Sequence, residues 1–169
     1  EGYDRTTPAL VMVTGSGQQN RDEEIYGHKP FAVISDALAR AGIATLRYDD
    51  RGYGGKAADI SGCTTDDFKN DALAGIELLR GRFDKVGVIG HSEGGTIALM
   101  LAAEQKADFI VSLAGMVISG AETLLLQNRI SLAQAGMSQE TIDTYCRILG
   151  EAFEAAINGG SAPDPEALL

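Results

Sequence analysis

The first two thirds of the chain alternate short apolar runs with amphipathic helical stretches, and this alternation limits the possible folds more than any other feature. The first run, residues 9–14, is apolar on both faces, as a strand inside a parallel sheet should be. Strands are expected over residues 9–14, 43–48, 86–89 and 109–113. Helices are expected between them, one opened by Pro30, one capped by Thr64 or Thr65, and one that follows residues 90–95. The sequence therefore predicts an α/β fold with a mainly parallel sheet flanked by helices.

The pattern changes beyond Gly115. Two helical stretches follow, at roughly 122–135 and 138–157, with no strand between them. The sequence thus predicts two parts, a sheet-containing segment over residues 1–118 and a helical segment over residues 119–169. One face of the last helix is expected to be apolar, and its residues are Ile142, Tyr145, Leu149, Phe153 and Ala156.

Composition excludes several function classes. The 169 residues include 14 Lys and Arg against 24 Asp and Glu, a net charge of −10, and the basic residues do not cluster, so a nucleic-acid partner is not expected. No apolar run approaches the roughly 20 residues of a membrane-spanning helix. Cys63 and Cys146 fit no zinc site, and neither a metal nor a cofactor is expected. The chain begins at Glu1 without a secretory signal, so we expect a soluble protein, either cytoplasmic or exported after removal of a signal peptide.

The strongest chemical signal is the sequence Gly90-His91-Ser92-Glu93-Gly94, which matches G-x-S-x-G between an expected strand and an expected helix. Such a turn is sharp and holds the serine in a strained conformation with its hydroxyl exposed. Gly90, Gly94 and Gly95 are expected because strand and helix backbones pass too close for side chains. Ser92 is therefore a candidate nucleophile, and the Glu93 N–H, at a helix N-terminus, is a candidate donor to an oxyanion. The second donor is expected from the loop after the first strand, around Ser16, Gly17 and Gln18.

Nucleotide binding is the main alternative interpretation of the glycine-rich turns. The P-loop pattern G-x-x-x-x-G-K-[ST] is absent from the sequence. Residues 52–57 fit a loosened dinucleotide fingerprint, but no helix is expected to begin there. A nucleotide site is therefore disfavoured.

Four motifs occur in one order along the chain: Gly15-Ser16-Gly17 with Arg21-Asp22-Glu23, Gly27-His28-Lys29-Pro30-Phe31, Leu46-Arg47-Tyr48-Asp49-Asp50-Arg51-Gly52 and Gly90-His91-Ser92-Glu93-Gly94-Gly95. In these motifs the chain resembles the α/β-hydrolase superfamily and, within it, a bacterial esterase-like group related to serine-peptidase-type hydrolases. The resemblance spans about residues 11–127. Two positions depart from the group's pattern, Gln18 in place of proline and Lys56 in place of serine.

The resemblance implies acyl transfer to water through a covalent acyl-enzyme on Ser92, with a small-molecule ester as substrate. In this superfamily the triad acid and histidine follow the nucleophile, yet His28 and His91 are the chain's only histidines and both precede Ser92. The resemblance therefore implies a central fragment of an incomplete α/β-hydrolase fold, inactive alone, with acid and base beyond the chain end. Residues 119–169 would begin a helical cap, in which Leu124, Leu125, Ile130 and Leu132 pack on the core or face the acyl pocket. The alternatives are a serine aminopeptidase or amidase of the same fold and a non-catalytic acyl-binding domain; the oligomeric state stays open.

The other polar residues are interpreted as structural. His91 is expected to project away from the reacting side of the turn, and His28 could order the oxyanion loop through hydrogen bonds. An Asp–Arg ion pair among Asp49, Asp50 and Arg51 is expected to brace the loop after the second strand, and Arg21, Asp22 and Glu23 to form a similar network. The Glu93 side chain is expected to contact a neighbouring loop, and Asp108 to be a solvated turn residue.

Overall fold

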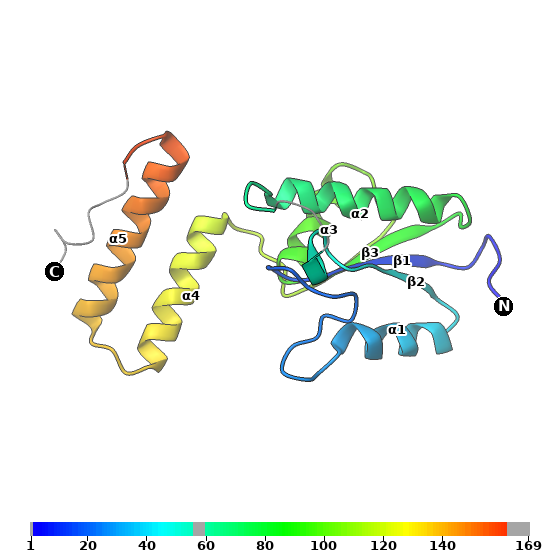
Figure 1. Cartoon of the computed structure of the whole chain (residues 1–169), viewed down its shortest axis with the longest axis horizontal. Coiled ribbons are helices and arrows are strands. Elements are labelled where there is room, and N and C mark those ends of the chain that lie inside the picture. The colour runs from blue at the N-terminus through cyan, green and yellow to red at the C-terminus, as the bar shows by residue number, and fades with distance from the viewer. Residues whose placement is uncertain (1, 56–59, 162–169) are drawn as a thin grey trace. The chain divides into compact units, whose positions relative to one another are not determined.

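The computed structural model describes residues 2–55 and 60–161 of the chain (Figure 1). It divides into two compact units, Glu1–Met116 and Val117–Leu169, which we describe separately. Lys56 and the end of the glycine-rich stretch 52–57 lie outside the described residues.

The first unit is built on a four-stranded parallel sheet, which confirms the predicted fold class. Its strands are β1 (Ala9–Val13), β2 (Ala44–Arg47), β3 (Val86–His91) and β4 (Ile110–Leu113), in the order β2-β1-β3-β4. In the register, Val11 of β1 lies opposite Leu46 on one side and Val88 on the other. Every residue of β1 is buried, as its uninterrupted apolar sequence predicts.

Helices cover both faces of this sheet because alternate residues of each strand face opposite sides. Val11 and Val13 face the core shared with α2 (Thr65–Arg80) and α3 (Glu93–Ala103). Leu10 and Met12 face the other side, where they pack with Phe31 of α1 (Pro30–Arg40). In Figure 1, α1 and α2 accordingly lie on opposite sides of the strands. This arrangement brings the carboxyl ends of all four strands to one edge, where the loops that bear the candidate site begin.

The structure differs from the predictions at the end of β3 and in the role of Asp108. β3 continues to His91, two residues beyond the expected end, because Gly90 and His91 still pair with Ser112 and Leu113 of β4. The interpretation of Asp108 as a merely solvated turn residue is wrong. Its carboxylate accepts a hydrogen bond from the Val86 N–H at 2.8 Å and so holds the first residue of β3.

The second unit contains α4 (Gly120–Gln134) and α5 (Gln139–Asn158), which pack against each other. Ser119 and Ser138 cap their N-termini, and Gly159 ends α5 in the left-handed conformation. The buried face of α5 runs through Ile142 and Cys146, whereas Tyr145, expected on that face, is 44% exposed. Leu124 and Ile130 are also exposed, while Leu125 and Leu132 are partly buried. None of the described helices is both long and apolar enough to cross a membrane.

Candidate active site

Ser92 lies at the junction of β3 and α3 in a strained backbone conformation. Its φ is 52° and its ψ is −117°, a region that residues with a Cβ seldom occupy, at a cost of about 1–3 kcal/mol. Hydrogen bonds on both sides hold it there, because the Ser92 N–H donates to the Leu113 carbonyl at 2.8 Å and its own carbonyl accepts from the Thr96 N–H at 3.1 Å. The turn is therefore determined by the sheet and the helix that flank it.

The glycines around Ser92 are required by close backbone contacts. A Cβ on Gly90 would lie 1.9 Å from the Gly94 carbonyl oxygen, and one on Gly94 would lie 2.1 Å from the Val13 carbonyl oxygen. A Cβ on Gly95 would lie 2.8 Å from the Gly115 Cα. Strand and helix thus approach each other at distances that leave no room for side chains.

Glu93 is the first residue of α3, so its N–H has no acceptor within the helix. Its side chain accepts a hydrogen bond from the Thr65 hydroxyl at 2.6 Å, which ties the N-terminus of α3 to that of α2. The partner expected in a neighbouring loop is therefore the first helical residue of α2. The Glu93 N–H, next to Ser92, is thus held in place both by α3 and by the side-chain contact with Thr65.

The loop after β1 presents backbone donors beside Glu93. Gly15, Gly17 and Glu93 line one small pocket that has room for roughly one water molecule, whereas Ser16 and Gln18 do not line it. Within the described residues, the N–H groups of residues 16–18 donate to no protein acceptor. Gly17 has a φ of 91°, which suits glycine. Of the three expected donor positions, the structure brings Gly17 to the pocket.

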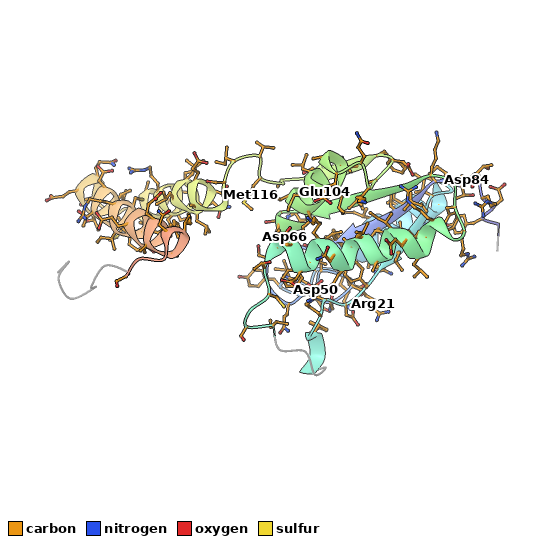
Figure 2. All side chains as sticks on the ribbon, turned by 90° about the horizontal axis from the view of Figure 1, so that it is seen from above. Arg21, Asp50, Asp66, Asp84, Glu104 and Met116 are labelled. Carbon is orange, nitrogen blue, oxygen red and sulfur yellow. The ribbon has the colours of Figure 1, made fainter. Side chains whose placement is uncertain are left out.

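Asp50 anchors this loop to the loop after β2. Its buried carboxylate accepts hydrogen bonds from the Thr14 hydroxyl at 3.0 Å and from the Gln19 N–H at 2.8 Å. Burial raises the pKa of the Asp50 carboxyl above its ordinary value, and the hydrogen bonds from Gln19 and Thr14 lower it in part. Asp50 lines the small pocket together with Phe68 of α2, and Figure 2 labels Asp50 and, on α2, Asp66.

We expect Asp50→Asn to change how stability depends on pH. Because the native pKa is raised, the native state binds more protons than the unfolded state between pH 3.8 and that raised value, and stability falls as pH rises through this window. The asparagine lacks this loss, so its free energy of unfolding should improve relative to the unsubstituted chain as pH rises. Urea unfolding at a series of pH values measures the difference.

Asp67→Asn is the matched control, and its effect on the pH dependence of stability should have the opposite sign. Hydrogen bonds from Thr64 lower the pKa of Asp67, so the stability that the charged form contributes is present above pH 3.8 and lost as pH falls through the lower native value. This variant should lose stability relative to the unsubstituted chain as pH rises. A parallel pH dependence in the two variants would contradict the assignment for Asp50.

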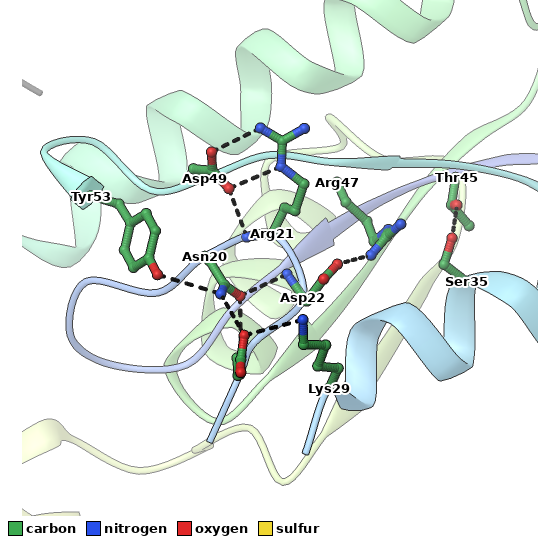
Figure 3. A network of polar contacts seen from close by, with 10 residues as sticks. Asn20, Arg21, Asp22, Lys29, Ser35, Thr45, Arg47, Asp49 and Tyr53 are labelled. Atoms are coloured by element: carbon green, nitrogen blue, oxygen red, sulfur yellow. Dashed lines mark hydrogen bonds and ion pairs between the residues drawn. The ribbon is translucent and has the colours of Figure 1, made fainter. Parts of the chain in front are cut away.

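Three consecutive charged residues that follow the loop after β1 contact three separate partners, so they do not form the single network that the sequence predicts. Arg21 forms a bidentate pair with Asp49, and Asp22 pairs with Arg47, as Figure 3 shows. Glu23 turns inward instead.

Glu23 is 1% exposed, and its Oε1 lies 2.8 Å from His91 Nδ1. The side chain of His28, proposed from the sequence to order the loop, is exposed and forms no hydrogen bond within the described residues. Only its backbone is bonded, to Ile25. The ordering contact therefore comes from His91, and no pattern in the sequence indicated this pairing.

Arg51 also differs from its predicted role. It pairs with Asp71 of α2 at 2.6 Å, rather than with Asp49 or Asp50, and its guanidinium lies over the Phe68 ring at 5.9 Å. Arg51 therefore fastens the loop after β2 to α2. Among the described residues, no group of three or more His, Cys, Asp or Glu side chains is placed to hold a metal ion.

Comparison with known proteins finds similarity to an esterase and to an acyl transferase. Over 109 residues the chain is 36% identical to Esterase EstD of Thermotoga maritima, a match that covers 63% of this chain and 26% of that protein. Over 89 residues it is 33% identical to an acyl transferase of Photobacterium leiognathi, with 52% of this chain and 29% of that protein covered. The chain thus spans less than a third of these curated relatives.

The fold is similar to that of the Pyrococcus furiosus esterase Pf2001. The TM-score is 0.58 at 19% identity, and the match covers 82% of this chain and 53% of that structure. Residues 28–144 match the family model described as "Serine aminopeptidase, S33", which is more than half of the chain. The chain therefore belongs to the serine aminopeptidase S33 family of α/β hydrolases.

Proposed function

We propose that the chain carries the nucleophile and oxyanion-binding half of a serine esterase, with Ser92 as the nucleophile. The observation that supports this most directly is the positive φ of Ser92 between β3 and α3, because a strained serine at such a turn presents its hydroxyl outward. The family match and the esterase among the relatives point to the same class of reaction.

The reaction would pass through an acyl-enzyme. The Ser92 oxygen attacks the ester carbonyl, its proton goes to a general base, and the carbonyl electrons move to the oxygen. The N–H groups of Glu93 and Gly17 would donate to that oxyanion. Collapse of the tetrahedral intermediate expels the alcohol, which takes up the proton, and attack by water then releases the acid and regenerates Ser92.

The general base would come from sequence outside this chain. Neither histidine hydrogen-bonds the Ser92 hydroxyl within the described residues, and His91 Nδ1 is engaged by Glu23. The relatives are more than three times as long as the segments matched here, which leaves room for a triad acid and histidine. We likewise propose that α4 and α5 belong to a helical cap segment.

A serine aminopeptidase is the second candidate, because the matching family carries that description. The two reactions share the acyl-enzyme and differ in the leaving group, an alcohol for an ester and an amine for an amide. An amine departs only when protonated, so amide cleavage depends more strongly on the general acid.

The test uses the protein at its full natural length. We expect a fluorophosphonate to label Ser92, identified by mass spectrometry of the modified peptide, and short-chain aryl acetates to be cleaved faster than aminoacyl anilides. Faster cleavage of the anilides would replace the esterase with the aminopeptidase. A folded full-length protein that neither labels nor cleaves either substrate would favour the non-catalytic acyl-binding domain.

A further inference from the structure

Glu23 places a buried carboxylate where the two backbone segments of the site meet. Its Oε1 accepts from the Gly15 N–H at 2.8 Å and lies 2.8 Å from His91 Nδ1. Gly15 opens the oxyanion loop, and His91 is the residue before Ser92. One oxygen atom therefore joins the loop after β1 to the end of β3, next to Ser92.

We propose that Glu23 is a positioning residue that sets the distance between the oxyanion loop and the nucleophile by acting through His91 and Gly15. The inference rests on the proposed function. Glu23 forms no hydrogen bond with the Ser92 hydroxyl and does not itself line the pocket, although its partner Gly15 does, so its effect reaches the reaction through the two segments that it holds.

The oxyanion loop lies directly against the nucleophile at Gly15. A Cβ on Gly15 would be 3.3 Å from the Ser92 Cβ and 3.5 Å from His91 Nδ1. Because Gly17 follows two residues later, a shift of Gly15 moves the oxyanion donor relative to Ser92. A misplacement of about 1 Å at a reacting centre can cost roughly 100-fold in rate.

The local backbone is shaped to aim Glu23 inward. Glu23 has a φ of 52°, and its N–H donates to the Asn20 carbonyl at 2.9 Å. The Asn20 side chain accepts from the N–H groups on both sides of Glu23, at 3.0 Å from Asp22 and 3.2 Å from Glu24 (Figure 3 shows Asn20 and Asp22). Strain of this kind persists only where surrounding contacts enforce it.

The buried carboxylate also determines the state of the imidazole. An unpaired buried carboxylate is costly, and the Gly15 N–H and the His91 ring are the donors that compensate Oε1. Since an ionised carboxylate only accepts hydrogen bonds, His91 would donate through Nδ1 when Glu23 is ionised. The neutral His91 ring would then be the Nδ1–H tautomer.

The experiment compares disruptive and conservative variants at full natural length. Glu23→Ala and His91→Ala remove the link. Glu23→Gln keeps an acceptor oxygen, and His91→Asn keeps a donor near the position of Nδ1. Glu77→Ala, at an exposed carboxylate of α2, is the matched control. We measure kcat and KM for an aryl acetate together with the rate of fluorophosphonate labelling.

We expect both alanine variants to lose roughly 30- to 100-fold in kcat with KM changed less than about 3-fold. Glu23→Gln and His91→Asn should recover kcat to within about 5-fold of the unsubstituted protein, and Glu77→Ala should leave it unchanged. His91→Ala also covers a failure of Glu23→Ala to fold, because the His91 side chain is 42% exposed.

NMR of protein labelled with 15N-glycine and 15N-histidine gives a readout independent of turnover. In Glu23→Ala the Gly15 amide proton should move upfield and exchange faster, and the His91 ring should lose its Nδ1–H preference. Alanine variants with kcat within 3-fold, or conservative variants as impaired as the alanine ones, would overturn the inference while the proposed function stands. A folded unsubstituted protein without Ser92 labelling would overturn the proposed function and this inference with it.

Discussion

Replacement of Ser92 by alanine in the full-length protein is expected to lower kcat for an aryl acetate by roughly 10⁴- to 10⁶-fold. The variant would lack the oxygen on which the proposed covalent intermediate forms, and only the proposed binding and oxyanion groups would remain to assist water. Stopped-flow assays and fluorophosphonate labelling measure the loss. Ser35→Ala is the control, because the Ser35 hydroxyl, on α1, lies 2.6 Å from the Thr45 hydroxyl, on β2. It should keep kcat within about 2-fold; a fall for Ser35→Ala like that of Ser92→Ala would contradict the assignment.

Ser92→Gly separates the chemistry of this residue from its backbone strain. Glycine adopts a φ of 52° without the steric penalty that serine and alanine share. Both variants should be inactive, but Ser92→Gly should exceed Ser92→Ala in free energy of unfolding by about 1 kcal/mol. Equal stabilities in urea unfolding would show that the turn stores no strain.

Local sequence patterns predicted the elements that carry the site. The apolar run of β1 and the helix opened by Pro30 are properties of neighbouring residues, so they could be recognised without knowledge of the fold. The turn at Ser92 could be recognised in the same way, because the G-x-S-x-G motif lies between an apolar strand pattern and a helical pattern. Its glycines are the residues that such a sharp turn requires. The end of β3 could not be placed, because Gly90 and His91 carry no strand signal and are held by pairing with β4.

Polar contacts between distant segments could not be predicted. Arg21, Asp22 and Glu23 are adjacent in sequence, yet they have three separate partners. The first two pair with Asp49 and Arg47, and the third is buried against His91, 68 positions away. The direction of each side chain depends on the turn around Asn20, which composition does not reveal. Charge alone shows that a loop is braced and leaves the partners open, as Arg51 and Asp71 also illustrate.

Gly94→Ala is expected to lower the free energy of unfolding by at least about 3 kcal/mol. The new Cβ would lie 2.1 Å from the Val13 carbonyl oxygen and 2.5 Å from that of Thr14, and no side-chain rotation can relieve an overlap with backbone. α3 would have to move away from β1, which displaces the Glu93 N–H. We therefore expect slower labelling of Ser92 even where the variant folds.

Two other glycines provide graded controls. At Gly75 of α2 a Cβ would meet side-chain atoms of Leu46 and Val11 at 3.2 Å, which can shift, so alanine should cost about 1 kcal/mol or less. At Gly62 nothing lies within 4 Å, and alanine should change stability by no more than about 0.5 kcal/mol. In urea unfolding, the loss of stability should be largest for Gly94→Ala, smaller for Gly75→Ala and smallest for Gly62→Ala. A Gly94→Ala variant as stable as Gly62→Ala would mean that α3 does not pack on the end of β1 at this distance, and the oxyanion donor at Glu93 would lose its structural basis.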